Sequence, residues 1–112
     1  MKPLVPIYQQ DWNFSQVKYF LGRWYEYDQH LNDLSDFDRA CVVELYTRLS
    51  YLSSSDRQLL ADKYHRPKGT RPTDQQQADI VGIPKVKYRK QRFSIELQLQ
   101  RHREHPADNA KS

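Results

Sequence analysis

Five positively charged side chains crowd residues 85–92, and they are Lys85, Lys87, Arg89, Lys90 and Arg92. Lysine and arginine bind phosphate groups, and the planar guanidinium of arginine also matches the O6 and N7 atoms of guanine. Shortly before this stretch, Ala78 and Gly82 are spaced as in two helices that a tight turn connects. The residue types therefore indicate a nucleic-acid-binding surface that a helix-turn-helix positions.

The helix-turn-helix is predicted to begin at Thr73, which forms a capping pair with Gln76. Ala78 is small enough for two helices to cross closely, and Gly82 supplies the positive φ of a tight turn. Pro84 is predicted to stand in the first turn of the last helix, where its missing N–H costs nothing. The predicted structural core of the motif consists of Ala78, Gly82, Ile83 and Tyr88.

The last helix, from Pro84, is expected to enter the major groove of double-stranded DNA with its opening turns. Arg89 is the predicted base reader, and Lys85 could act in the same way with less directional contacts. Lys85, Arg89 and Arg92 are predicted to share one helix face. Phosphate contacts are predicted for Lys87, Lys90, Arg92 and Gln75. The loop before the motif is expected to follow the flanking backbone, or to enter a minor groove, through Arg66, Lys68 and Arg71.

The distribution of charge over the 112 residues agrees with this interpretation. Residues 1–52 carry five Lys or Arg and seven Asp or Glu, whereas residues 53–112 carry thirteen and seven. Within residues 66–92 there are eight cations and two anions. By charge alone a solvated basic face would be the better interpretation. Because the charge coincides with the helix-turn-helix pattern, a nucleic-acid interface is favoured.

The remaining sequence predicts an all-α protein of about five helices. Helices are expected over residues 13–32, 35–51, 53–64, 73–81 and from Pro84 to about Arg103, each of the first four behind a capping pair. The predicted buried positions of the first helix are Val17, Phe20, Trp24, Tyr27, Leu31 and Leu34. Those of the second helix are Phe37, Cys41, Leu45, Leu49 and Leu52. The short link between these two helices predicts an antiparallel hairpin.

The segment Leu52-Ser-Ser-Ser-Asp-Arg-Gln-Leu-Leu-Ala-Asp-Lys-Tyr64, with Gln77-Ala-Asp-Ile-Val-Gly-Ile-Pro84 and Tyr88, resembles region four of bacterial sigma factors. Small phage late-gene regulators of the ArpU and RinA type share this layout. The resemblance covers residues 52–102, and it implies a transcription regulator, encoded by a phage or prophage, that contacts RNA polymerase. Two features depart from the pattern. The basic loop 66–72 is longer and richer in proline, and Pro84 replaces the usual Ser or Thr cap.

Three parts of the chain are predicted: an N-terminal helical hairpin at 1–52, a DNA-binding region at 53–103 and a disordered tail at 104–112. Residues 1–12 are expected to be extended. One helix-turn-helix touches few bases, so the hairpin is a candidate for dimerisation through residues 14–52, or for binding a partner. The alternative, that Trp24, Tyr25 and Tyr27 only complete the core of a monomer, stays open.

Several classes of function find no support in the sequence. His30, His65, His102 and His105 lack zinc-site spacing, no glycine-rich phosphate loop occurs, and the acidic pairs stand at helix starts. We therefore expect no enzyme, no metal and no cofactor. The single Cys41 fits a reducing cytosol, and no apolar run is long enough for a membrane span, so a cytoplasmic location in a bacterial host is expected.

Two other functions remain alternatives to transcription regulation. Small terminase subunits of phage DNA packaging also combine a helix-turn-helix with oligomerising helices, although usually with the DNA module first. A protein-binding module would instead dock the basic helix on an acidic host partner.

Overall fold

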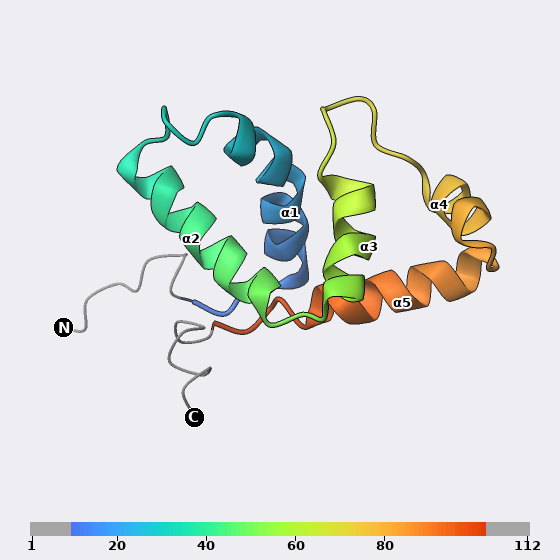
Figure 1. The fold of residues 1–112 in the computed structure, drawn as a ribbon. Helices are drawn as coiled ribbons and strands as arrows, with labels where there is room; N and C mark the ends of the chain where they lie inside the picture. The colour runs from blue at the N-terminus through green and yellow to red at the C-terminus, as the bar shows by residue number, and fades with distance from the viewer. Residues whose placement is uncertain (1–9, 103–112) are drawn as a thin grey trace.

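The computed structural model describes residues 10–102, which form five α-helices and, within that range, no strand (Figure 1). The helices are α1 (Phe14–Gln29), α2 (Asp36–Ser50), α3 (Ser54–Tyr64), α4 (Asp74–Val81) and α5 (Lys85–Leu97). The predicted all-α class of about five helices is confirmed. Most of the predicted extended start, residues 1–12, and all of the predicted disordered tail, residues 104–112, lie outside the described residues.

Each of the first four helices begins at the predicted capping residue. The side chains of Asn13, Ser35, Ser53 and Thr73 accept hydrogen bonds from the backbone N–H three residues later. Two of these caps are capping boxes with a second hydrogen bond. The Gln16 side chain accepts from the Asn13 backbone N–H, and the Gln76 side chain accepts from the Thr73 backbone N–H. Local side-chain chemistry therefore sets the helix starts.

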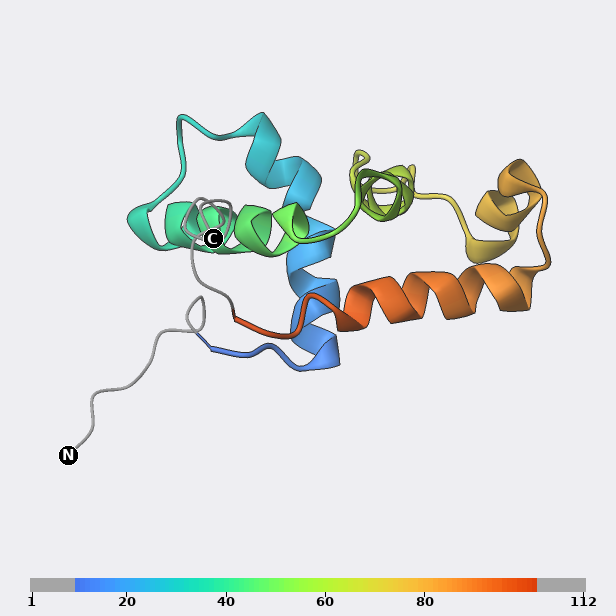
Figure 2. The same ribbon diagram turned by 60° about the horizontal axis from the view of Figure 1, so that its bottom comes forward.

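The helix α1 packs against α2, α3 and α5 (Figures 1 and 2). The main hydrophobic core of the described residues lies around it. The core contains Trp12, Phe20 and Trp24 together with Leu60 and Ile95. It therefore crosses residue 52, the predicted boundary between the hairpin and the DNA-binding region. Trp24 and Tyr27 are 8% and 2% exposed, so both side chains are used within the monomer.

Three details of the predicted helices are wrong. The helix α1 ends at Gln29, which leaves Leu31 47% exposed beyond it. Phe37 lies in the first turn of α2 and is 55% exposed. The helix α5 ends at Leu97 rather than near residue 103, because hydrogen bonds of the tighter i→i−3 type follow it. These bonds turn Leu99 into the core, where it is fully buried.

A buried arginine joins both ends of the described chain to α2. The Arg48 side chain is 1% exposed, and its Nε donates to Glu44 Oε2 at 2.6 Å. Its Nη1 donates to the carbonyl oxygens of Leu99 and Gln100, at 2.7 and 3.0 Å, and its Nη2 to that of Gln10 at 2.5 Å. The guanidinium also lies 3.7 Å from the ring centroid of Trp12. Arg48 therefore satisfies backbone groups from segments that lie far apart in the sequence.

Replacing Arg48 with methionine, Arg48→Met, should lower the free energy of unfolding by about 3–5 kcal/mol. The buried Glu44 would lose its arginine and keep, among the described residues, only the contact with His102. Three backbone carbonyl oxygens would also lose the donor that Arg48 provides. Urea denaturation followed by circular dichroism measures this difference. The control is Arg39→Met in the same helix, where the side chain is exposed. Equal unfolding midpoints for the two variants would show that Arg48 contributes no more than a surface residue.

Candidate nucleic-acid interface

The predicted helix-turn-helix is formed by α4, a turn at Gly82 and α5. Gly82 has φ 83°, and its backbone N–H donates to the carbonyl oxygen of Ala78 at 2.8 Å. The N–H of Ile83 donates to the same oxygen at 3.1 Å, which closes the end of α4. Ala78 and Tyr88 are fully buried, as predicted for the core of the motif. Burial raises the pKa of Tyr88 to about 12, so its phenol is neutral at physiological pH.

Pro84 is not in the first turn of the last helix, as predicted, but directly before the helix. It is the N-cap of α5, with φ −62° and ψ 147°, and the helix itself begins at Lys85. A proline offers no side-chain oxygen to the first backbone N–H groups of the helix, so no side-chain cap is formed.

The α4–α5 corner, which we define as residues 74–92, extends away from α2 (Figures 1 and 2). Within α4 the buried side chains are Gln77 and Ala78, so this helix brings little apolar surface to the contact. Ala78 and Tyr88 also lie outside the main hydrophobic core. Another interaction must therefore contribute to holding α4 in place.

That interaction is a network of charged groups from three helices. Asp74, the first residue of α4, lies 2.9 Å from Lys63 Nζ of α3 and 3.1 Å from Arg92 Nη2 of α5. Arg92 Nη1 in turn donates to Glu96 Oε2 at 2.7 Å. Tyr64 of α3 donates its hydroxyl to the same oxygen at 2.7 Å. The network therefore ties α4 and α3 to the C-terminal half of α5.

Burial and pairing act in opposite directions on these groups. Burial alone would raise the pKa of Asp74, but the hydrogen bonds from Lys63 and Arg92 prevail and lower it. Burial would likewise lower the pKa of Arg92, and the hydrogen bond to Glu96 prevails and raises it. For Tyr64, burial and the neighbouring Glu96 carboxylate both raise the pKa of the phenol. The charged forms of Asp74 and Arg92 are therefore stabilised by each other's presence.

The prediction that Arg92 lies on an exposed face and holds a phosphate is wrong. Its residue is 8% exposed, and its guanidinium is bound to Asp74 and Glu96. The spacing of Arg92 and Glu96, four residues on a helix, is the sequence signal that could have revealed this pairing.

The other four cations of α5 are exposed, and we call them the basic face: Lys85, Lys87, Arg89 and Lys90. The three lysines form no ion pair with any residue between 10 and 102. The Arg89 side chain is 59% exposed, and its Nε lies 3.5 Å from Asp74 Oδ2. Asp74 therefore orients Arg89 loosely while it holds Arg92 firmly.

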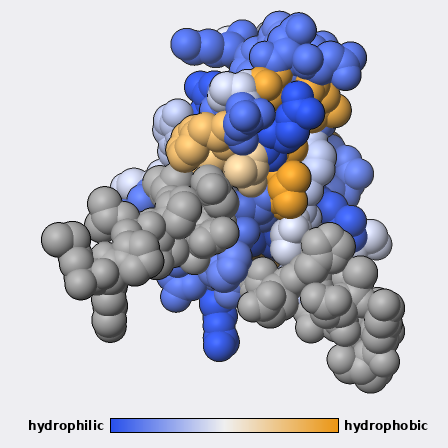
Figure 3. Space-filling view, turned by 90° about the vertical axis from the view of Figure 1, so that its left-hand side faces the viewer, coloured by the Kyte–Doolittle hydropathy of each residue, from blue (hydrophilic) through white to orange (hydrophobic). Residues whose placement is uncertain are grey.

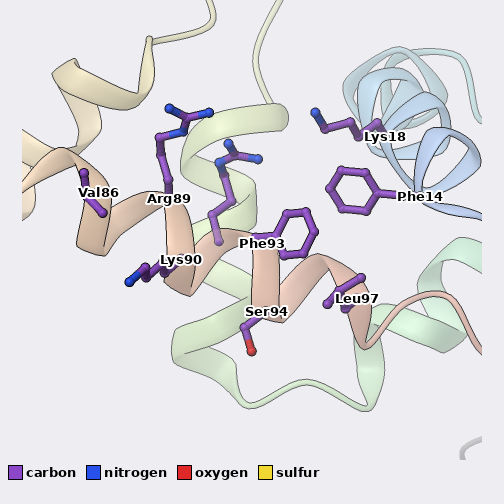
Figure 4. Close-up of a pocket in the computed structure, with 9 residues that line it drawn as sticks. Phe14, Lys18, Val86, Arg89, Lys90, Phe93, Ser94 and Leu97 are labelled. Carbon is purple, nitrogen blue, oxygen red and sulfur yellow. The ribbon is translucent and has the colours of Figure 1, made fainter.

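A groove of about 530 Å³ runs between the start of α1 and α5 (Figure 4). Its apolar lining includes Phe14 of α1 and Phe93 of α5, whose ring centroids lie 4.6 Å apart. Cations from both helices, Lys18 of α1 with Arg89 and Lys90 of α5, also line it. Lys18 was not predicted from the sequence, because nothing local indicates that α1 and α5 pack together.

The residues predicted to flank the interface are partly engaged in other contacts. Arg66 Nε donates to the carbonyl oxygen of Asp62 at 2.5 Å, and the Arg71 guanidinium donates to that of Gly22 in α1. Gln75 Nε2 donates to Asp79 Oδ1 at 2.7 Å. Lys68 is exposed at the tip of the loop. A Cβ at position 22 would stand 3.5 Å from Arg71 Nη1, an ordinary van der Waals distance, so this contact does not require glycine.

Comparisons of the chain with known protein families, with curated proteins and with solved structures give no match. Among residues 10–102, no group of three or more His, Cys, Asp or Glu residues is placed to hold a metal ion. None of the helices in this range combines the length and apolar character that a membrane crossing needs.

Replacing the carboxylate at the centre of the network, Asp74→Asn, should lower the free energy of unfolding by about 1–3 kcal/mol at pH 7, since charged hydrogen bonds are lost. The folded-state pKa of Asp74 is below its ordinary value of 3.8. Its contribution is therefore complete above that value and is lost as the pH falls through the lowered pKa.

Urea titrations of both proteins between pH 7 and pH 2 would measure this difference. The exposed Asp79→Asn change in the same helix is the control, with an expected effect within about 0.5 kcal/mol. A wild-type advantage over Asp74→Asn that stayed constant down to pH 2 would contradict the role given to the ionised carboxylate.

Proposed function

We propose that this chain is a sequence-specific regulator of transcription that binds double-stranded DNA and reads the major groove with α5. The observation that carries the proposal is the exposed basic face on the first two turns of a helix that Gly82 sets against α4. Helix-turn-helix proteins use these turns of the second helix for base contacts. Residues 52–102 resemble region four of bacterial sigma factors, which supports a contact with RNA polymerase. Small phage late-gene regulators of the ArpU and RinA type share this layout, which supports a phage or prophage origin.

The charge distribution around α5 favours an anionic partner. Lys85, Lys87 and Lys90 keep their full charge available because no described carboxylate pairs with them. The first N–H groups of α5 lack a side-chain cap, so the helix terminus adds its own attraction for a phosphate. Lys18 lies on the same side as the basic face across the groove, and it would extend the phosphate contacts beyond α5.

Arg89 remains the proposed base reader, because it is the exposed guanidinium of the basic face. Its contact with Asp74 is long, at 3.5 Å, so Arg89 can leave it to bind guanine. Asp74 would then still be paired with Lys63 and Arg92. Lys87 and Lys90 are proposed phosphate contacts, and Lys85 can serve either role. Lys68 and Arg71 are proposed to reach the flanking backbone.

The groove beside α5 favours a second candidate, a protein-binding module for an acidic partner. Val86, Phe93 and Leu97 are 64%, 48% and 40% exposed, which is more apolar surface than phosphate contacts would use. An acidic segment with its own apolar side chains would match the groove lining and the cations beside it. Such a partner would cover Arg89 and Lys90, so it would compete with DNA.

Arg89→Ala should reduce discrimination between the best duplex and its point variants by about 1–3 kcal/mol at one guanine. Lys90→Ala should weaken binding to all duplexes to a similar extent and lower the slope of log K against log salt by about 0.9. Fluorescence anisotropy with duplexes selected from a random pool would measure both effects.

The matched control is Arg39→Ala, which removes an exposed arginine of α2. This change should alter neither the discrimination between duplexes nor the salt slope. An unaltered sequence preference in Arg89→Ala would remove the assigned base reader. Failure of the wild-type protein to bind any duplex at low salt would overturn the proposed function and leave the acidic partner as the remaining candidate.

We propose that a second copy supplies the second half-site, because one such motif contacts few bases. Two exposed apolar side chains suit this contact, Leu31 just after α1 and Val43 of α2. Figure 3 shows that apolar surface gathers on the side of the molecule where α2 lies. Analytical ultracentrifugation should show a dimer, with or without DNA, and the double change Leu31→Ser and Val43→Ser should weaken this dimer about tenfold. A monomer at all concentrations, even on a palindromic duplex, would contradict the dimer.

A further inference from the structure

Val86 is an apolar side chain placed among the cations of the basic face. It is the second residue of α5 and is 64% exposed. Arg89 and Lys90 follow it by three and four residues, the spacings that make side chains neighbours on a helix surface. All three side chains line the same groove (Figure 4). The Val86 side chain therefore lies beside Arg89 and Lys90, which are the proposed base and phosphate contacts.

The chemistry of the major groove limits what such a group could contact. The base edges there present hydrogen-bond donors and acceptors, and the one apolar group among them is the C5 methyl of thymine. A phosphate would give Val86 no apolar partner, and the deoxyribose carbons are the same in every nucleotide. Among the base edges, only a thymine methyl would be buried against Val86 with a hydrophobic gain.

We infer that Val86 is a specificity-determining residue that recognises a thymine methyl group beside the guanine contacted by Arg89. This inference rests on the proposed function. Three residues of helix advance about 4.5 Å, and base pairs are spaced by about 3.4 Å. The thymine therefore lies within about two base pairs of the guanine.

The experiment uses the full chain and duplexes selected from a random pool, in which each thymine near the guanine is replaced in turn by deoxyuridine. This change removes one methyl group and leaves base pairing intact. For the wild-type protein, one replacement should weaken binding about fourfold, the effect expected for a group of this size. The Val86→Ser variant should bind the thymine and uracil duplexes equally well.

Val81→Ser is the matched control, since Val81 is 54% exposed on α4 and should not affect the uracil test. Circular dichroism of the variants would confirm that exposed substitutions leave the helices intact. Specific wild-type binding that ignores every uracil replacement would overturn this inference and leave the proposed function standing. The same holds if the selected sites contain no preferred thymine, or if Val86→Ser keeps the discrimination. Absence of binding to any duplex would overturn both.

Discussion

Asp74 lies between two cations, Lys63 of α3 and Arg92 of α5, and these contacts hold the α4–α5 corner together. The helix α4 spans eight residues and buries two side chains, so hydrophobic contact alone gives it weak support. A buried charge without its partner is strongly unfavourable, so each member of the network requires the others. The orientation of α5 relative to α4 thus depends on charge pairing inside the protein.

The same pairing divides the cations of α5 into two groups. Arg92 points inward because Glu96, one turn later, and Asp74 on the neighbouring helix neutralise it. The lysines of the basic face have no carboxylate within reach among the described residues, so their charge faces solvent. A helix with five cations in its first eight residues can therefore pack closely on one side and present exposed positive charge on the other.

Local chemistry explains which features could be predicted from the sequence. The capping pairs, the positive φ of Gly82 and the burial of Ala78 and Tyr88 follow from residue types a few positions apart. The place of Lys18 beside α5 depends on helix packing between distant segments, and no local pattern encodes it. The prediction for Arg92 is wrong because Glu96, which follows one turn later, pairs with the guanidinium and draws it inward. The exposure of Phe37 shows in turn that an apolar residue at a helix start need not face the core.

Arg48 brings the two ends of the described chain together on α2. Backbone hydrogen bonds complete the junction, since Trp12 N–H donates to the Gln100 carbonyl oxygen at 2.6 Å and His102 N–H donates to Asp11 Oδ1 at 2.8 Å. In Figures 1 and 2 this junction lies far from α4. Residues 10 and 102 therefore lie at the same edge of the molecule. A fluorophore attached at either residue would lie far from α4.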